Sequence, residues 1–327
     1  MSLILDFETN KSVKISIGDC RELLRQMPDN FVHTCVTSPP YFGLRDYGMD
    51  DQIGLEQTPE EFVAQLVDVF REVKRVLRDD GTLWLNLGDS YASYRDGKAT
   101  PDTTRGDSEG TLVPKGSAKN RMASTFAGSS IKHKDLIGIP WRVAFALQAD
   151  GWYLRQDIIW HKPNPMPESV QDRCTKSHEY IFLLSKSPKY YFDHESIKEP
   201  AIHAGKVAYN GGARNGMCEG YDGHRTRAGL AIHKPVADTR NKRSVWTITT
   251  KPFKGAHFAT FPPDLIEPCI LAGCPEGGTV LDPFGGAGTT GLVASRHGRN
   301  AILCELNPEY AELAKNRISD DNPLFNI

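Results

Sequence analysis

Two short segments of the chain hold residue types that could act on a ligand, and the first is Ser38–Tyr41. It reads Ser-Pro-Pro-Tyr and directly follows an apolar run that we predict to be a strand. Two consecutive prolines cannot continue a strand ladder, so they form a rigid corner and leave the carbonyl between them free as an acceptor. Ser38 adds a hydroxyl and Tyr41 an aromatic face. This set suits a planar base with an exocyclic amine, and the alternative is a plain turn.

The second segment is rich in glycine and reads Asp282-Pro-Phe-Gly-Gly-Ala-Gly-Thr-Thr-Gly291. Three of its glycines fit G-x-G-x-x-G, which lets the backbone approach a ligand closely, and the following helix N-terminus favours an anionic group. Glu305 ends the next predicted strand, where a carboxylate can accept hydrogen bonds from ribose hydroxyls. The segment therefore predicts a nucleotide-type cofactor site.

Two other nucleotide sites compete for this motif. A nicotinamide or flavin site normally needs a second βαβ half downstream, and only 36 residues follow Gly291. A P-loop needs Gly-Lys-Ser or Gly-Lys-Thr, which the segment lacks. A tight turn between strand and helix without a ligand is the third alternative, although an ordinary connection would not need so many special residues.

The elements that must position both segments alternate between strand-like and helix-like patterns, which favours an α/β fold with a mostly parallel sheet. The predicted strands are 13–17, 32–37, 82–87, 153–160, 179–185, 279–281 and 301–304. The predicted helices begin at Pro59, after a Thr58 cap with Glu61 closing a capping box, and near Thr290, and cover 136–149 and 308–318. Ligands of open α/β sheets bind at the carboxyl ends of the strands, where both segments fall.

Composition excludes several classes of protein. The chain has 327 residues and a formal charge of −2, and 39% hydrophobic with 24% charged residues is typical of a globular protein. No apolar run is long enough to cross a membrane, and the N-terminus lacks the features of a secretory signal. Seven cysteines without a C-x-x-C pair predict reduced thiols and a cytoplasmic protein. The ten histidines show no metal-ligand spacing, so we predict no metal.

Local charge differs from the balanced total in two segments. Residues 93–135 hold eight Lys or Arg against five Asp or Glu, and residues 201–245 hold eight against three. Both are also poor in regular apolar periodicity. Long basic segments of this kind suit a polyanion such as DNA or RNA, and the alternative is a solvated loop.

Taken together, Thr37-Ser-Pro-Pro-Tyr and Asp282-Pro-Phe-Gly-Gly-Ala-Gly-Thr resemble the signatures of S-adenosylmethionine-dependent DNA amino-methyltransferases. The catalytic motif precedes the cofactor loop, which is the order of the family's beta group. The segments 17–20, 81–89, 160–167, 177–182 and 257–262 are similar to further family motifs in the same order. The resemblance covers most of 12–92, 136–195 and 245–318 and leaves both basic segments outside.

The resemblance implies a Rossmann-like class I methyltransferase fold, circularly permuted, with a seven-stranded sheet in which one strand is antiparallel. It implies one catalytic domain over 1–327, a basic insertion at 93–135 and a target-recognition region at 197–245. Its catalytic residues would be Ser38, Pro39, Pro40 and Tyr41. Its S-adenosyl-L-methionine site would include Asp19, His257, Phe258, Thr260, Asp282, Phe284, Gly285, Gly286, Gly288, Thr289 and Glu305. For contacts with DNA we single out Arg214, Arg225, Arg227, Arg240, Lys242 and Arg243.

The implied reaction is direct methyl transfer to an exocyclic amine of a base flipped out of duplex DNA. Family members with Ser at the first catalytic position mostly modify cytosine N4, and those with Asp mostly modify adenine N6. Ser38 therefore favours cytosine, with adenine as the alternative. A non-catalytic nucleic-acid-binding module on the same fold is the alternative of another class. The family also suggests a restriction–modification context, in which a cognate endonuclease would share the target site.

Four further residues have a plainer interpretation. Arg45 and Asp46 follow Tyr41 and either line the base pocket or pair with each other in a turn. His161 is expected to order a loop. Cys35 lies within a predicted strand and is expected to be a buried packing residue, so no covalent enzyme–base intermediate is expected.

Overall fold

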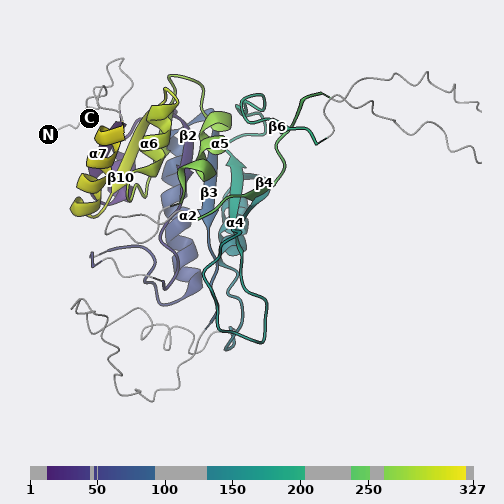
Figure 1. Ribbon diagram of the computed structural model, residues 1–327. Coiled ribbons are helices and arrows are strands. Elements are labelled where there is room, and N and C mark those ends of the chain that lie inside the picture. Colours follow the sequence, from purple (N-terminus) through teal and green to yellow (C-terminus); the bar gives the residue numbers. More distant parts are fainter. Residues whose placement is uncertain are drawn as a thin grey trace, which may run out of the picture. The chain divides into compact units, whose positions relative to one another are not determined.

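The computed structural model describes residues 13–44, 48–49, 51–92, 131–202, 237–250 and 261–321, and the statements below concern these residues (Figure 1). The basic segment 93–135 therefore lies almost entirely outside the described residues. Contacts divide the chain into two compact units, Met1–Asp193 with Ser244–Ile327, and His194–Arg243. None of the described helices is long and apolar enough to cross a bilayer.

The first unit is built on one eight-stranded sheet. In chain order its strands are β1 (Val13–Ile17), β2 (Val32–Thr37), β3 (Leu77–Leu87), β4 (Tyr153–His161), β5 (His178–Ser185), β8 (Val245–Thr247), β9 (Thr279–Asp282) and β10 (Asn300–Glu305). They lie in the order β1-β10-β9-β2-β3-β5-β4-β8. Only β5 runs antiparallel to its neighbours, so the predicted mostly parallel α/β sheet is confirmed. The expected number of seven strands is exceeded by the three-residue β8, which pairs with β4 at the edge.

The pairing of the strands explains how motifs at opposite ends of the chain come together in the fold. The last two strands, β9 and β10, insert between β1 and β2, and all four run parallel. Ile17 of β1 is in register with Glu305 of β10, and Leu303 of β10 with Asp282 of β9. Since parallel strands end at the same edge, the sheet brings the C-terminal glycine loop beside the N-terminal Ser38.

Helices cover both faces of this sheet, as Figure 1 shows. One layer holds α1 (Cys20–Arg25), α2 (Pro59–Val76) and α4 (Ile139–Ala149), and the other holds α5 (Pro263–Gly273), α6 (Thr289–Arg296) and α7 (Pro308–Asp321). The predicted capping box of α2 is confirmed, because Thr58 and Glu61 each bond the other's backbone N–H. The prediction for α4 was wrong at its start, since Gly138 at φ +78° delays the helix until Ile139. The six-residue α1 is too short for its periodicity to be visible in the sequence.

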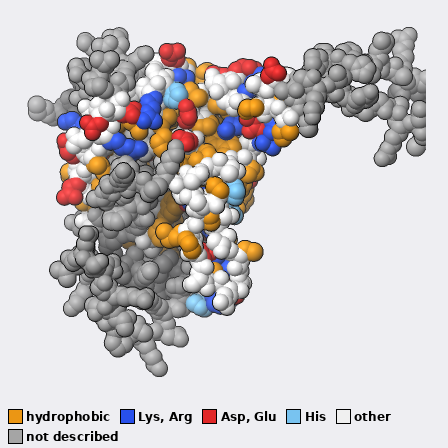
Figure 2. All heavy atoms as spheres, viewed as in Figure 1, with side chains coloured by type: hydrophobic (Ala, Val, Ile, Leu, Met, Phe, Trp, Pro, Cys, Tyr) orange, Lys and Arg blue, Asp and Glu red, His pale blue; other side chains and the backbone are white. Residues whose placement is uncertain are grey.

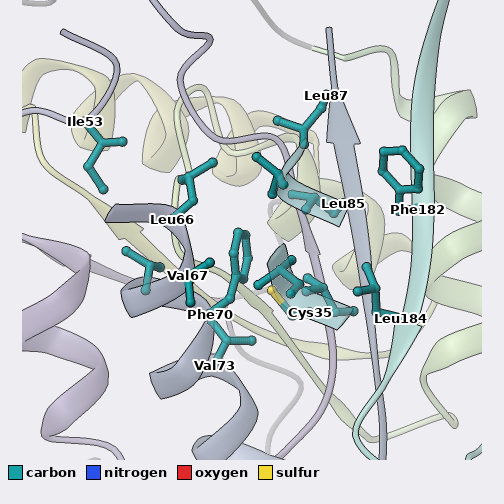
Figure 3. Close-up of a cluster of buried hydrophobic side chains, with 14 of the residues drawn as sticks. Cys35, Ile53, Leu66, Val67, Phe70, Val73, Leu85, Leu87, Phe182 and Leu184 are labelled. Carbon is teal, nitrogen blue, oxygen red and sulfur yellow. The ribbon is translucent and has the colours of Figure 1, made fainter. Parts of the chain in front are cut away.

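The largest apolar cluster lies between the sheet and the first helix layer. Figure 3 shows Leu66 and Phe70 of α2 pointing into the same cluster as Leu85 of β3 and Leu184 of β5. All four are fully buried, and so is Cys35 of β2, which confirms it as a packing residue. Burial raises the pKa of the Cys35 thiol well above its usual value, so it remains an unreactive thiol at neutral pH. This core fixes the ends of β2, β3 and β5 relative to one another.

The second unit covers residues 197–243 of the predicted target-recognition region 197–245, and its described part is small. It contains β6 (Glu199–Pro200) and β7 (Thr239–Arg240), which pair antiparallel. The backbone N–H of Ala201 also donates to the Asp238 carbonyl at 2.9 Å. Residues 203–236 between these strands lie outside the described residues. The hairpin thus ties the two ends of this segment together.

Candidate active site at the carboxyl edge of the sheet

The Ser-Pro-Pro-Tyr corner begins immediately after β2 ends at Thr37, as predicted. Ser38 is half-buried and Pro39 is buried. Within the described part of the chain, no group is hydrogen-bonded to the Ser38 hydroxyl or to the Pro39 carbonyl. Two polar groups held on a rigid, partly buried corner are thus available to a ligand, which is the arrangement that an amine-bearing base needs.

Tyr41 is held by contacts that come from β3, β5 and the end of β4. Its hydroxyl donates to Glu179 Oε2 at 2.7 Å and lies 3.4 Å from Asn86 Oδ1. The other carboxylate oxygen of Glu179 forms an ion pair with Lys162 Nζ, which also lies 4.2 Å from the ring centre of Trp160. The Glu179 and Lys162 side chains are only 15% and 18% exposed. The ring of Tyr41 is therefore oriented by a charged pair that two neighbouring strands supply.

Two glycines allow other backbone segments to approach the same corner closely. A Cβ on Gly88 would lie 2.4 Å from Cε2 of Tyr41, so the tyrosine ring packs directly on this backbone. Gly54, at φ +109°, would place a Cβ 3.2 Å from that of Pro40, and its carbonyl accepts the Gly43 N–H at 2.8 Å. A side chain at either position would press against the Ser38–Tyr41 corner.

The glycine loop between β9 and α6 uses its glycines in two different ways. Gly286 and Gly288 adopt positive φ angles of 49° and 74°, and Gly288 caps α6. Gly285 and Gly291 instead permit close packing, because their Cβ atoms would lie 3.0 Å from Cβ of Leu303 and 2.8 Å from Cγ1 of Val13. The loop conformation is thus required by backbone and packing together, and its glycines keep side chains short where the loop turns.

Asp282 links the glycine loop to the end of β2, directly before the Ser38–Tyr41 corner. Its carboxylate accepts the hydroxyls of Thr37 and Thr290, each at 2.6 Å, and the backbone N–H of Phe284 at 3.1 Å. Burial raises the pKa of Asp282, and these three hydrogen bonds oppose that rise. Because both oxygens are engaged within the protein, Asp282 would act on a cofactor through the loop that it holds. Phe284 is half-buried and packs on the core cluster.

The other two acidic residues predicted for the cofactor, Asp19 and Glu305, lie just after β1 and at the end of the neighbouring β10. Glu305 accepts the N–H of Gly286 at 2.7 Å and that of Asn307 at 2.9 Å, and burial raises its pKa despite these bonds. Asp19 caps α1 and is paired with Arg21. Burial alone would raise the pKa of Asp19, but the hydrogen bonds from Arg21 outweigh it and the pKa is lowered. Unlike Asp282, both carboxylates are half-buried, and a carboxylate oxygen can accept more than one hydrogen bond, so beside the glycine loop they fit the hydroxyls and amine of an adenosine-type cofactor.

Thr289 has a protein partner that sequence analysis did not identify. Arg317 of α7 donates to the Thr289 hydroxyl at 2.9 Å and to the Ala287 carbonyl at 3.0 Å. Burial lowers the pKa of this guanidinium, and nearby Arg296 lowers it further. Arg317 of α7 therefore holds the glycine loop in place through hydrogen bonds to Thr289 and Ala287. Thr289 thus has a structural contact within the protein in addition to its predicted role at the cofactor.

The residues that sequence analysis missed share one property, which is that they act through another residue. Glu179, Lys162 and Arg317 lie far in sequence from the groups that they contact. Nothing in the local pattern of the chain distinguishes them from other charged residues. The resemblance offered one signal, because Lys162 and Glu179 fall within the segments 160–167 and 177–182 that match family motifs.

Several predicted residues lie outside the described residues. These are His257, Phe258, Thr260, Arg214, Arg225 and Arg227, together with Arg45 and Asp46. His161 is the last residue of β4, so the prediction that it orders a loop was wrong: its Nδ1 lies 3.2 Å from the Thr247 hydroxyl of neighbouring β8 and links two strands. Among the described residues no three His, Cys, Asp or Glu side chains gather as a metal site.

The described arginines of the second unit are partly neutralised. Arg240 and Arg243 both donate to Glu199 Oε1, at 2.9 and 2.6 Å, and their hydrogen bonds lower the pKa of Glu199 although burial alone would raise it. Lys242 lies between them in sequence. Figure 2 shows positive and negative side chains intermixed over α6 and α7, so the described atoms of that face form no broad single-sign patch.

Comparisons with known proteins agree on one family. The family model described as DNA methylase, of the N6/N4 methyltransferase type, matches residues 32–316. The type II methyltransferase M.SmaI from Serratia marcescens is 49% identical over 308 residues, which cover 94% of this chain and 91% of that protein. M.Cfr9I from Citrobacter freundii is 47% identical over 305 residues, 93% of this chain and 87% of that protein.

Solved structures share the fold at lower identity. A putative DNA modification methylase from Thermus thermophilus, complexed with S-adenosyl-L-methionine, is 24% identical, with a TM-score of 0.59 and 96% of each chain covered. The PvuII DNA methyltransferase, cytosine-N4-specific by its description, is 20% identical with a TM-score of 0.59, covering 96% of this chain and 92% of that one. Both likenesses place the eight-stranded sheet among class I methyltransferase folds.

Proposed function

The chain belongs to the DNA methylase family of N6/N4 amino-methyltransferases, and from that premise we propose that it methylates the exocyclic N4 of a cytosine within a specific DNA site. The family's methyl donor is S-adenosyl-L-methionine. The observation that supports the proposal best is the corner at Ser38, where a hydroxyl and the Pro39 carbonyl are without hydrogen-bond partners among the described residues, beside an oriented tyrosine.

The chemistry of the target amine explains why these groups suffice. An exocyclic amine is a poor nucleophile because its lone pair is delocalised into the ring. The Ser38 hydroxyl and the Pro39 carbonyl can accept its two hydrogens, which favours a tetrahedral nitrogen with a localised lone pair. The sulfonium donor supplies an already activated methyl group when bound. The protein therefore contributes positioning and partial-charge stabilisation more than strong acid–base catalysis.

Tyr41 has a separate task in this scheme. Its ring can stack on the extruded base, and the electron-rich face can also stabilise positive charge that passes close to it. The base has to leave the duplex for this contact, at a cost of a few kcal/mol that stacking and hydrogen bonding can offset. The corner at Ser38 and Tyr41 thus fits a flipped base better than one inside the helix.

Ser38 supports cytosine as the base, with adenine N6 as the alternative. The support comes from the family pattern of Ser for cytosine N4 and Asp for adenine N6, because a hydroxyl can accept from the amine and donate to the neighbouring ring nitrogen of either base. Arg240, Lys242 and Arg243 border the segment 203–236, and we propose that this region, 197–245, recognises the target sequence. A type II context with a cognate endonuclease and a cytoplasmic location form part of the same proposal.

The deciding experiment is nucleoside mass spectrometry of DNA incubated with the protein and labelled S-adenosylmethionine. Labelled N4-methylcytosine is the expected product. Labelled N6-methyladenine would keep the family and overturn the base assignment. No label with the wild type, on DNA of varied sequence, would favour a non-catalytic nucleic-acid-binding module instead.

A further inference from the structure

The surroundings of Tyr41 contain a polar network that the reaction scheme above does not use. Tyr41 donates to Glu179 Oε2 at 2.7 Å, and Glu179 Oε1 forms an ion pair with Lys162. The amide nitrogen of Asn86 donates to the Tyr180 carbonyl at 3.0 Å and lies 3.4 Å from Glu179 Oε2. The network therefore joins three neighbouring strands, β3, β5 and β4, to the end of the catalytic corner.

The backbone of β3 constrains the same tyrosine ring from a second direction. Gly88 follows the last residue of β3, and a Cβ there would lie 2.4 Å from Cε2 and 3.0 Å from Cδ2 of Tyr41. The ring packs against a bare backbone, and the position of its hydroxyl end is set by the bond to Glu179. Two independent contacts fix one aromatic side chain at the edge of the sheet.

We propose that Glu179, held in place by Lys162, is a positioning residue that fixes the Tyr41 ring for stacking on the target base. The inference rests on the proposed methyltransferase function and adds residues to its site. Glu179 touches neither base nor cofactor in this proposal. Its effect passes through the phenol hydroxyl.

The charges of the network support this role over simple stabilisation of the fold. An ionised carboxylate accepts a phenol hydrogen bond more strongly than a neutral oxygen does, and it increases the electron density of the ring. A poorly exposed carboxylate needs a compensating cation, and Lys162 supplies it while contacting the Trp160 ring at 4.2 Å. Lys162 and Glu179 are in facing segments, since His161 of β4 is in register with His178 of β5.

The expected loss of kcat follows from the cost of misplacing the Tyr41 ring relative to the base. A misplacement of about 1 Å in a reacting complex can cost about 100-fold in rate. Loss of Glu179 removes the shorter of the two hydrogen bonds of the Tyr41 hydroxyl and leaves the ring against Gly88, so we expect kcat to fall about 10- to 100-fold in Glu179→Ala. The affinity for S-adenosyl-L-methionine should remain within about twofold, because the cofactor residues lie at β1, β9 and β10.

The test is a double-mutant cycle between Tyr41→Phe and Glu179→Ala, measured by kcat, by KM for DNA and by cofactor affinity. Both single variants should lower kcat, and the double variant should be no slower than the slower single variant. Glu179→Gln, which keeps an acceptor oxygen, should recover part of the lost rate. Glu72→Gln is the matched control, since Glu72 forms an ion pair of similar exposure with Arg75 on α2.

Two results would overturn the inference. Additive losses in the cycle would show that Glu179 acts independently of Tyr41, and full activity of Glu179→Ala would show that the bond has no role in positioning. Neither result affects the proposed function, which fails only if the wild type itself transfers no methyl group. Gly88→Ala provides a second variant, which leaves both Tyr41 and Glu179 unmutated. It should lower kcat because its Cβ displaces the Tyr41 ring.

Discussion

The glycine loop and the Ser38–Tyr41 corner meet at one edge of the sheet, but they are constructed differently. The loop's polar groups are engaged by the protein itself: Asp282 by two threonines, Glu305 by two backbone N–H groups and Thr289 by Arg317. At the corner, the Ser38 hydroxyl and the Pro39 carbonyl have no partner among the described residues.

This difference indicates two ways of preparing a site. The loop depends on backbone conformation and on several hydrogen bonds within the 24 residues from Asp282 to Glu305, to which Thr37 and Arg317 add bonds from outside. The corner depends on side chains from β3, β4 and β5, which approach it only in the folded sheet. A loop held by its own bonds can bind one invariant cofactor, whereas open groups on a rigid corner can act on a substrate that arrives afterwards.

The largest effect on the reaction should come from removing the Ser38 hydroxyl, which has no hydrogen-bond partner among the described residues. Ser38→Ala is expected to lower kcat by about 100- to 1,000-fold, the usual cost of losing one preorganised polar contact in a transition state. Cofactor affinity, measured by calorimetry, should stay within about twofold. Ser187→Ala, which loses a surface hydroxyl bonded to Asp79, should retain full activity. Unchanged turnover in the Ser38 variant would refute the catalytic assignment.

The next largest effect should come from the backbone of the loop. Gly288→Ala places a Cβ 2.7 Å from that of Ala314 at φ +74°, so it combines a steric clash with an unfavourable conformation. We expect it to lower the free energy of unfolding by about 2 to 4 kcal/mol and to weaken cofactor binding. Gly277→Ala is the matched control, because Gly277 has the same φ of +74° but open space around its Cβ position.

Urea denaturation of the two alanine variants separates strain from packing. The Gly277 variant should lose only about 1 to 2 kcal/mol, the cost of the left-handed conformation itself. Equal losses of unfolding free energy in the two variants would mean that the close contact between Gly288 and Ala314 of α7 contributes nothing to stability. The glycine loop would then not be held by packing on α7.

A smaller effect should appear where the two regions are joined. Thr37→Val removes one hydroxyl from buried Asp282 without changing the shape of the side chain. We expect a loss of about 1 to 3 kcal/mol of stability, with both kcat and cofactor affinity reduced. Thr34→Val, on the same strand but bonded to Thr82, should affect stability only. If Thr37→Val changed only kcat, the Thr37–Asp282 bond would not couple the glycine loop to the Ser38–Tyr41 corner.

The smallest effect should be a pH dependence from Asp282. Burial raises its pKa above the ordinary value of 3.8, so the folded state retains a proton that the unfolded state releases. Its contribution to stability is therefore fully present below pH 3.8 and is lost as the pH rises through the folded pKa. Asp282→Asn should lack this loss. In denaturant titrations, the free energy of unfolding of the wild type relative to that of Asp282→Asn should fall as the pH rises from 3.8 through the folded pKa. A rise would contradict a raised pKa of Asp282.

Prediction from sequence was most successful where the determining contacts are local. The capping box at Thr58, the strand that ends at Thr37 and the turn between β9 and α6 depend on neighbouring residues, and all are confirmed. The three-residue β8 and the six-residue α1 were not predicted, because elements so short owe their form to the strands and helices beside them.

The sequence by itself determined the class of the sheet, the family and the two segments that meet at its edge. It could do so because glycine, proline and periodic apolar residues restrict the backbone wherever they occur. Only the tertiary structure placed Glu179 against Tyr41, Thr37 against Asp282 and Arg317 against Thr289. These bonds join residues that are 28 to 245 positions apart in the chain, so no local pattern encodes them. They exist because β9 and β10 fold back between β1 and β2, and because β5 lies between β3 and β4.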